Sequence, residues 1–215
     1  MSFLKNTVIF VADVLEVVGY VVLSPFYLVG WLYSEIFPDK DRTGLAIFGM
    51  EESGKTTIFN YLRNENMVGA TSVRELNEFE YKLENGKTRL IKKGVDIGGG
   101  TEYIKAYYAP MLSDNNYDVY FFVFNSFKYL TEQTEQLNIN ARIKFIKEKN
   151  IENKKIILIG SHFDKFKIDE SKVRSEITSK VKDKDYVSLF SEHLVLMNLT
   201  DKRILKEFFN KKAFK

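Results

Sequence analysis

The chain contains no cysteine and only three prolines and two histidines among its 215 residues. Without cysteine, a disulfide scaffold, a thiolate zinc site, a thiol nucleophile and a prenyl or palmitoyl anchor are all excluded. The two histidines do not favour a metal site built from imidazole ligands. A formal net charge of only +3 does not indicate a nucleic-acid partner. What is present, 45% hydrophobic and 28% charged residues, is typical of a folded globular protein of one full-sized domain.

The first 40 residues differ in character from the rest of the chain. Between Val8 and Tyr33 the only charged side chains are Asp13 and Glu16. As one helix, this stretch would be roughly 39 Å long, enough to cross a hydrocarbon core of about 30 Å. The sequence therefore predicts a hydrophobic, membrane-associated helical segment over residues 1–40 and a separate domain over residues 41–215.

The way in which this segment meets the membrane is left open by the sequence. Ser24-Pro25 lies in its middle, and proline removes a helical hydrogen bond and favours a kink or turn. A tilted single span and a re-entrant hairpin are both compatible with this pattern, and so is an apolar helix pair buried in the protein or at a subunit interface. A secretory signal peptide fits poorly, because the run is too long and carries two acids.

From Asp41 onward, short apolar runs alternate with amphipathic stretches. Runs that are apolar on both faces are typical of buried parallel strands; they are Leu45–Phe48, Tyr117–Phe124, Ile156–Ile159 and Leu194–Met197. The runs Glu78–Leu83 and Thr88–Lys92 flank Asn85-Gly86, which is a strong hairpin signal. We expect an α/β domain with three layers: a six-stranded, mostly parallel sheet with one antiparallel edge strand and helices on both faces.

A phosphate-binding pattern directly follows the first of these strands. Gly49, four further residues, Gly54, Lys55 and Thr56 match G-x-x-x-x-G-K-[ST], with a strand before the match and a helical pattern after it. The glycines let successive N–H groups point at phosphate oxygens, Lys55 reaches the β- and γ-phosphates, and the Thr56 hydroxyl ligates Mg²⁺. The predicted phosphate-binding residues are Gly49, Glu52, Ser53, Gly54, Lys55, Thr56 and Thr57.

Three further strand ends carry residues that suit a nucleotide. Asp96-Ile97-Gly98-Gly99 is a D-x-x-G, in which the acid can hold Mg²⁺ through water and the Gly99 N–H can approach the γ-phosphate. Ser161-His162-Phe163-Asp164 follows a later strand, and the Asp164 carboxylate can accept hydrogen bonds from guanine N1–H and the exocyclic amine, which adenine cannot offer. Asn198-Leu199-Thr200 follows the last strand and is the expected position of another base-contacting loop.

With these motifs, residues 41 to the end resemble a Ras-superfamily small GTPase, most closely the Arf-like branch and the β subunit of the signal-recognition-particle receptor. The resemblance implies a P-loop NTPase fold, bound GTP or GDP with Mg²⁺, a cytoplasmic G domain on a membrane anchor, and a protein effector or activating partner at the switch regions. The N-K-x-D motif of the family appears here with Ser161 and His162 in its first two positions. The resemblance also implies a switch threonine, for which Thr71 is the candidate and Ser72 the second choice.

From this resemblance we expect Lys55, Thr71 and Gly99 to be the catalytic groups, Thr56, Thr71 and Asp96 the metal ligands, and Ser161, His162, Asp164 and Asn198 the base-side ligands. The family's catalytic glutamine is replaced by Gly100, so we expect slow intrinsic hydrolysis in a GTP/GDP-dependent switch. Two alternatives remain open: a pseudo-GTPase membrane scaffold that binds nucleotide structurally, and an ATP-using P-loop enzyme, which Asp164 disfavours.

Overall fold

The structure is a computed structural model, and it describes residues 41–64, 73–76, 78–97, 104–113, 117–149 and 154–214. The predicted membrane segment, residues 8–33, lies outside these ranges, so the membrane association stays a prediction. None of the helices within the described ranges combines the length and the apolar character that a membrane crossing requires. Asp41–Lys215 forms one compact unit.

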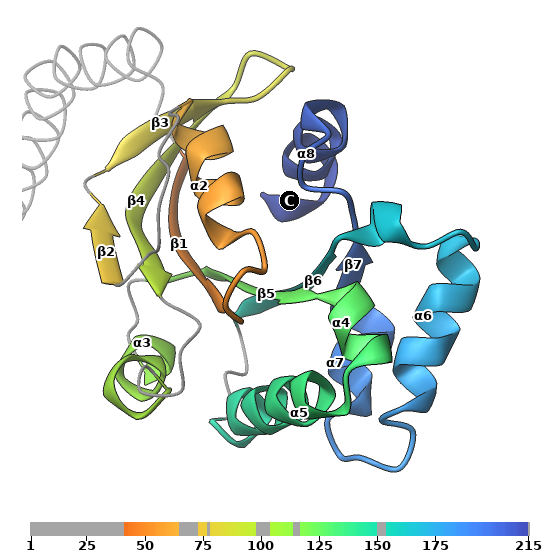
Figure 1. Cartoon of the computed structure of the whole chain (residues 1–215). Helices are drawn as coiled ribbons and strands as arrows, with labels where there is room; N and C mark the ends of the chain where they lie inside the picture. The colour runs from red at the N-terminus through yellow and green to blue at the C-terminus, as the bar shows by residue number, and fades with distance from the viewer. Residues whose placement is uncertain are drawn as a thin grey trace, which may run out of the picture. The chain divides into compact units, whose positions relative to one another are not determined.

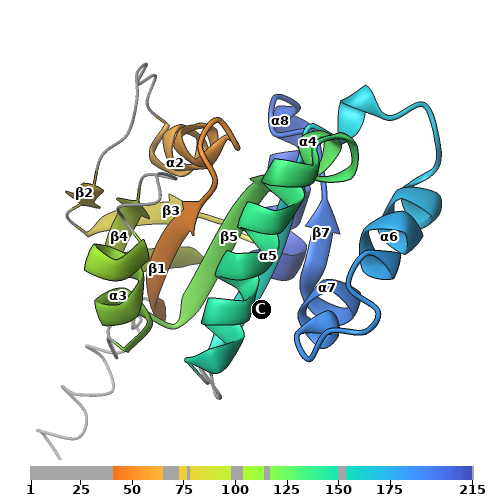
Figure 2. The same cartoon turned by 60° about the horizontal axis from the view of Figure 1, so that its bottom comes forward.

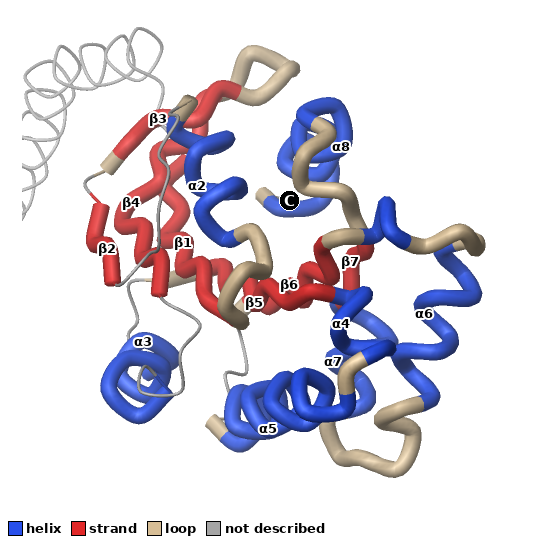
Figure 3. The backbone as a smooth tube through the Cα atoms, in the orientation of Figure 1, coloured by secondary structure: helices blue, strands red, loops and turns tan. Residues whose placement is uncertain are grey.

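A mostly parallel sheet runs through this unit with the strand order β2-β4-β1-β5-β6-β7 (Figure 3). Its strands are β1 (Asp41–Gly49), β2 (Val73–Leu76), β3 (Phe79–Lys82), β4 (Thr88–Ile97), β5 (Val119–Asn125), β6 (Lys155–Ser161) and β7 (Leu194–Leu196). The neighbours from β4 through β7 pair in parallel. The prediction of an α/β domain with a mostly parallel sheet is confirmed, and the carboxyl ends of β1, β4, β5, β6 and β7 lie at one edge.

The antiparallel edge consists of two strands instead of one. β2 pairs with the Gly94–Ile97 half of β4, and β3 pairs with its Thr88–Ile91 half. Seven strands therefore occupy six positions. The hairpin between β3 and β4 lies where the sequence predicts it, with Gly86 at φ +82° in its turn. β2 was missed because the two apolar residues of Val-Arg-Glu-Leu are spaced by three and do not alternate.

Helices cover both faces of the sheet, as predicted. They are α2 (Lys55–Arg63), α3 (Ala109–Ser113), α4 (Ser126–Thr131), α5 (Gln133–Glu148), α6 (Glu170–Ser179), α7 (Val187–His193) and α8 (Lys202–Phe208), with the π-helical segments η1 (Ile104–Tyr108) and η3 (Phe209–Ala213) and the 3₁₀ turn η2 (Phe163–Lys165). In Figure 1, α2 and α8 lie on one side of the sheet, and α3 and α5 lie on the other.

Alternate residues of the central strands build a separate apolar core on each face. On β5, Phe121 and Val123 belong to the cluster that includes the buried side chains of α2 and α8. Phe122 and Phe124 belong to the cluster that includes α5 and α7. This alternation is the period of a β-strand, and it explains why all seven residues of β5 are buried.

The C-terminal end of the chain is fastened to the β3–β4 hairpin. The Arg89 Nη2 donates to the Phe214 carbonyl oxygen at 2.9 Å, and the Glu84 N–H donates to Asn210 Oδ1 at 2.9 Å. An ion pair of 2.8 Å joins Lys206 to Glu84. Residues 125 and 126 positions apart in the sequence therefore close one face of the sheet together.

Two residues of α5 test this description of the core. Ile143 is fully buried and Leu137 is 60% exposed on the same helix. We expect Ile143→Ala to lower the free energy of unfolding by about 2–5 kcal/mol, because the lost methyl groups leave a cavity. Leu137→Ala should change it by less than about 0.5 kcal/mol. Urea denaturation of both variants checks this, and equal losses would contradict the assignment of the buried face.

Candidate functional site

The loop between β1 and α2 is bounded by two glycines whose backbone requires them. Gly49 has φ +141°, and a Cβ at this position would lie 2.0 Å from the Val123 carbonyl oxygen. The same carbonyl accepts the Met50 N–H at 2.9 Å. Gly54 has φ +93°, and its Cβ would lie 2.5 Å from Leu199 Cδ1. Both glycines of the predicted motif are therefore needed for the course of the chain and for close packing.

Lys55 folds back over this loop instead of extending into solvent. Its side chain is 6% exposed, and its Nζ donates to the Met50 carbonyl oxygen at 2.7 Å. The Ser53 hydroxyl donates to the same oxygen at 2.8 Å. An ammonium held inside a turn at the start of a helix suits an anion, because the N-terminus of the helix adds positive potential there. Thr56 is half-buried in the first turn of α2 and Thr57 is exposed.

The predicted magnesium and γ-phosphate residues are only partly within the described ranges. Thr71 and Gly99 lie outside them, as does Gly100. The Asp96 backbone lies on β4, paired in register with Ile47 of β1. No group of three or more acidic or histidine side chains able to hold a metal ion occurs among the side chains that the structure describes. The metal site stays a prediction.

Ser161 and His162 form a hydrogen-bonded pair at the end of β6. The Ser161 hydroxyl is 1% exposed and donates to the Phe124 carbonyl oxygen at 3.1 Å. Its oxygen lies 2.8 Å from His162 Nδ1. A carbonyl oxygen only accepts, so the Ser161 hydroxyl uses its hydrogen in the bond to Phe124. The His162 ring therefore donates its Nδ1–H to the Ser161 oxygen, and in the neutral ring Nε2 is then an acceptor. The Ser161 hydroxyl thus positions His162, and it joins β6 to β5.

The environment of His162 favours its neutral form. Burial lowers the pKa of the ring, and the positive charge of Lys165 lowers this pKa further. The backbone of His162 is left-handed, with φ +59°. Asp164, the predicted guanine ligand, is exposed on η2 immediately after this residue. The neutral ring and the carboxylate therefore both follow the carboxyl end of β6, separated by Phe163 alone.

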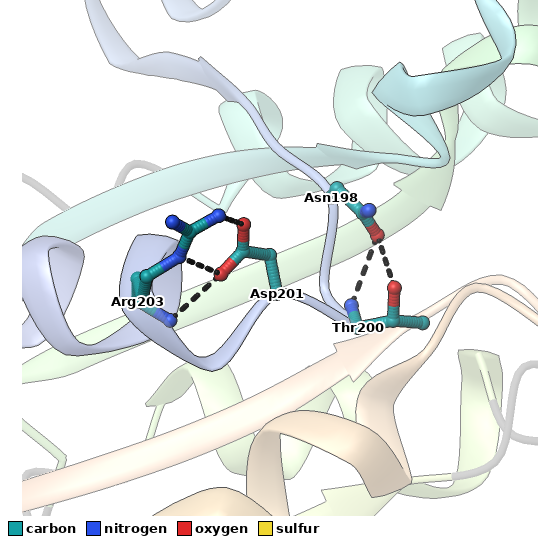
Figure 4. A network of polar contacts seen from close by, with 4 residues as sticks. All are labelled: Asn198, Thr200, Asp201 and Arg203. Carbon is teal, nitrogen blue, oxygen red and sulfur yellow. Dashed lines mark hydrogen bonds and ion pairs between the residues drawn. The ribbon is translucent and has the colours of Figure 1, made fainter.

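The loop after β7 is held by its own polar contacts, which Figure 4 shows. Asn198 Oδ1 accepts from the Thr200 N–H at 3.0 Å and from its hydroxyl at 2.8 Å. Asp201 caps α8 by accepting the Arg203 N–H at 2.9 Å. Leu199 is buried and packs against Gly54. This contact brings the loop after β7 beside the loop after β1, as expected for strands whose carboxyl ends share an edge.

The sequence did not predict the polar contacts of two residues near the loop. Tyr108 is fully buried, and its hydroxyl donates to the Gly49 carbonyl oxygen at 3.2 Å. Burial raises the pKa of this hydroxyl to about 12, so it remains a donor at neutral pH. Lys128 of α4 forms an ion pair with Glu52 inside the loop. A tyrosine in a helical pattern gives no sign of a polar role, and nothing near Lys128 in the sequence identifies its partner.

Comparison with known proteins adds no further identification: no protein-family model matches the chain, and a search of curated proteins finds no match. The resemblance to small GTPases therefore rests on the motifs themselves.

The two glycines Gly49 and Gly86 provide a matched test of the loop. Both have positive φ, but a Cβ at Gly86 meets no atom within 4 Å. We expect Gly86→Ala to cost about 1 kcal/mol of unfolding free energy from backbone strain alone. Gly49→Ala should cost distinctly more, because the β1–β5 contact must open. Thermal and urea unfolding of both variants measures the difference, and equal costs would show that the approach to Val123 is not tight.

Proposed function

We propose that this chain binds guanine nucleotides and acts as a membrane-associated, GTP/GDP-dependent switch of the small-GTPase type. The observation that carries this proposal is the loop from Gly49 to Gly54, which joins a buried strand to a helix and encloses the ammonium group of Lys55. The strand order and the position of this loop at the carboxyl edge of the sheet are compatible with a P-loop NTPase fold.

The phosphate side of the proposal follows from the groups that the loop offers. Backbone N–H groups and the N-terminus of α2 would face an anion bound in the loop. Lys55 would exchange the Met50 carbonyl oxygen for β- and γ-phosphate oxygens, at little cost because the ammonium is already desolvated. Thr56 in the first turn of α2 and Asp96 on β4 are oxygen donors that suit Mg²⁺, with Thr71 as the third expected ligand. Bound Mg²⁺ would neutralise charge between the β- and γ-phosphates.

The base side of the proposal rests on Asp164. Its carboxylate is exposed on η2, after the carboxyl end of β6. A carboxylate accepts two hydrogen bonds from guanine N1–H and the exocyclic amine, whereas adenine presents no matching pair of donors. His162, with Nδ1 bonded to Ser161, is a ring that can lie against the base. An ATP-using enzyme is the less favoured alternative for this reason.

The proposed chemistry is GTP hydrolysis at a low intrinsic rate, because Gly100 has no side chain to orient the attacking water. The second candidate, a pseudo-GTPase scaffold on the membrane, is favoured by the same residue. Phosphate release measured in a single turnover separates the two, since a switch must hydrolyse its nucleotide and a scaffold need not. Residues 8–33 would anchor the G domain on the cytoplasmic side, and an effector or activating partner would contact the switch regions.

Lys55→Ala tests the phosphate site. We expect the affinity for GTP·Mg²⁺ to fall by at least about 100-fold, because a buried, charge-assisted contact is lost. Lys144→Ala, at an exposed lysine of α5, is the matched control and should bind as the wild type does. Isothermal titration calorimetry gives both affinities. Unchanged binding by Lys55→Ala would rule out the loop as the phosphate site.

Asp164→Ala tests the base. The wild type should prefer GDP over ADP, and the variant should lose most of this preference, because the hydrogen bonds to a charged acceptor carry about 1.5–3 kcal/mol. Asp169→Ala changes another exposed aspartate of the same segment and should keep the preference. Competition between GDP and ADP for a fluorescent nucleotide measures it. Equal competition by the two nucleotides on the wild type would end the guanine assignment.

A further inference from the structure

The proposed phosphate site contains an electrostatic conflict. Glu51 and Glu52 lie inside the loop and are exposed, and Lys55, the first residue of α2, is the single cationic residue from Gly49 to Lys55. Two carboxylates against one ammonium leave the loop with a net charge of −1. A polyphosphate brings several negative charges to the same few ångströms, so an uncompensated carboxylate there weakens binding.

A lysine on a different element compensates part of this negative charge. Lys128 Nζ lies 3.3 Å from Glu52 Oε2. Lys128 stands in the first turn of α4, where its N–H donates to the side chain of the capping residue Asn125 at 3.0 Å. Asn125 is itself buried at the end of β5. The ammonium is thus carried on a backbone fixed to the sheet, close to the loop that follows β1.

α4 also lies next to the base side of the proposed site. Figure 2 shows α4 beside the segment that leads from β6 into α6. The Phe127 ring lies 5.6 Å from that of Phe166, beyond η2. The charge of Lys128 also contributes to the lowered pKa of His162. Lys128 is therefore near both the phosphate side and the base side.

The remaining charges around Lys128 are mostly acidic. Its pKa is raised, first by the hydrogen bond with Glu52 and then by the charges of Glu52, Glu132 and Glu135. The pKa of Glu135 is raised by burial, and the charges of Glu132 and Glu51 raise it further, while those of Lys128 and Arg142 lower it. Several carboxylates therefore surround the Lys128 ammonium, and it forms its ion pair with that of Glu52.

Building on the proposed function, we propose that Lys128 is a charge-compensating residue of the phosphate site, which acts by neutralising Glu52 and so permits a polyphosphate to bind beside it. Lys128 is a positioning residue in this scheme and reaches the nucleotide through Glu52. The Glu52 side chain is 81% exposed and that of Lys128 37%, so the pair adds little to folding stability. Its effect appears when a further negative charge enters the loop.

The test is a rescue experiment on nucleotide affinity. We expect Lys128→Met to weaken GDP and GTP binding about three- to fivefold, with the larger loss for GTP, because one exposed carboxylate is left to repel the phosphates. Glu52→Gln alone keeps the backbone N–H by which this residue is predicted to contact phosphate and removes only the negative charge of its side chain, so it should bind at least as tightly as the wild type. The double variant Lys128→Met/Glu52→Gln should return to within about twofold of the wild type, because no uncompensated charge remains.

A matched control and a salt series complete the design. Lys144→Met removes an exposed lysine of α5 whose partner Glu148 lies 3.6 Å away, and it should leave both affinities unchanged. In about 1 M salt, where the screening length is about 3 Å, the loss in Lys128→Met should largely disappear. Isothermal titration calorimetry with GDP and GTP in Mg²⁺ buffer measures all of these variants.

The outcomes separate this inference from the function on which it rests. If the wild type binds neither nucleotide, both proposals fall. If the wild type binds and Lys128→Met binds equally well, or if Glu52→Gln does not rescue Lys128→Met, only the role of Lys128 is overturned. Weaker binding by Glu52→Gln alone would also overturn it. That result would mean that the ion pair supports binding by holding the loop against α4, and not by neutralising the charge of Glu52.

Discussion

The approach of Gly49 to Val123 is the contact on which the arrangement of the candidate site depends. β1 is bonded to β4 on one side and to β5 on the other, so its carboxyl end is held from both directions. The Val123 carbonyl oxygen receives the Met50 N–H, and the Gly49 carbonyl oxygen receives the Tyr108 hydroxyl. Because Gly49 has no side chain, the end of β1, the loop after it and η1 can all come into contact there. These contacts fix the direction in which the loop leaves the sheet.

Much of the fold could be predicted because it depends on local patterns. The apolar runs of β1, β5 and β6 are buried on both faces, which is the sequence character of central parallel strands. Asn85-Gly86 marks the hairpin as a turn signal, and Gly86 in this turn has φ +82°, a conformation that is accessible mainly to glycine. The curled loop from Gly49 to Gly54 could be predicted because G-x-x-x-x-G-K between a strand and a helix requires it, and the structure shows the positive φ at both glycines. That this loop binds an anion stays a prediction.

The parts that could not be predicted are contacts between residues far apart in the chain. Periodicity shows which face of an element is buried, but it does not name the partner across the interface. The hydrogen bond from the Tyr108 hydroxyl to Gly49 and the ion pair of Lys128 with Glu52 are therefore visible only in the arrangement of the elements. Ser161 is a similar case: the sequence presents it as a substituted base ligand, and the structure shows its hydroxyl engaged between Phe124 and His162.

The fastening of the C-terminal end to the hairpin bears on how the domain is made on the ribosome. Arg89 is bonded to Phe214 across 125 positions of sequence, and Glu84 to Asn210 across 126. Such distant contacts are the slow, entropically costly part of folding. Until α8 and η3 have been synthesised, the face formed by Phe121 and its neighbours has α2 alone as its helical cover. The nascent sheet must then wait with part of one apolar side open, and α8 and η3 complete the cover of this face.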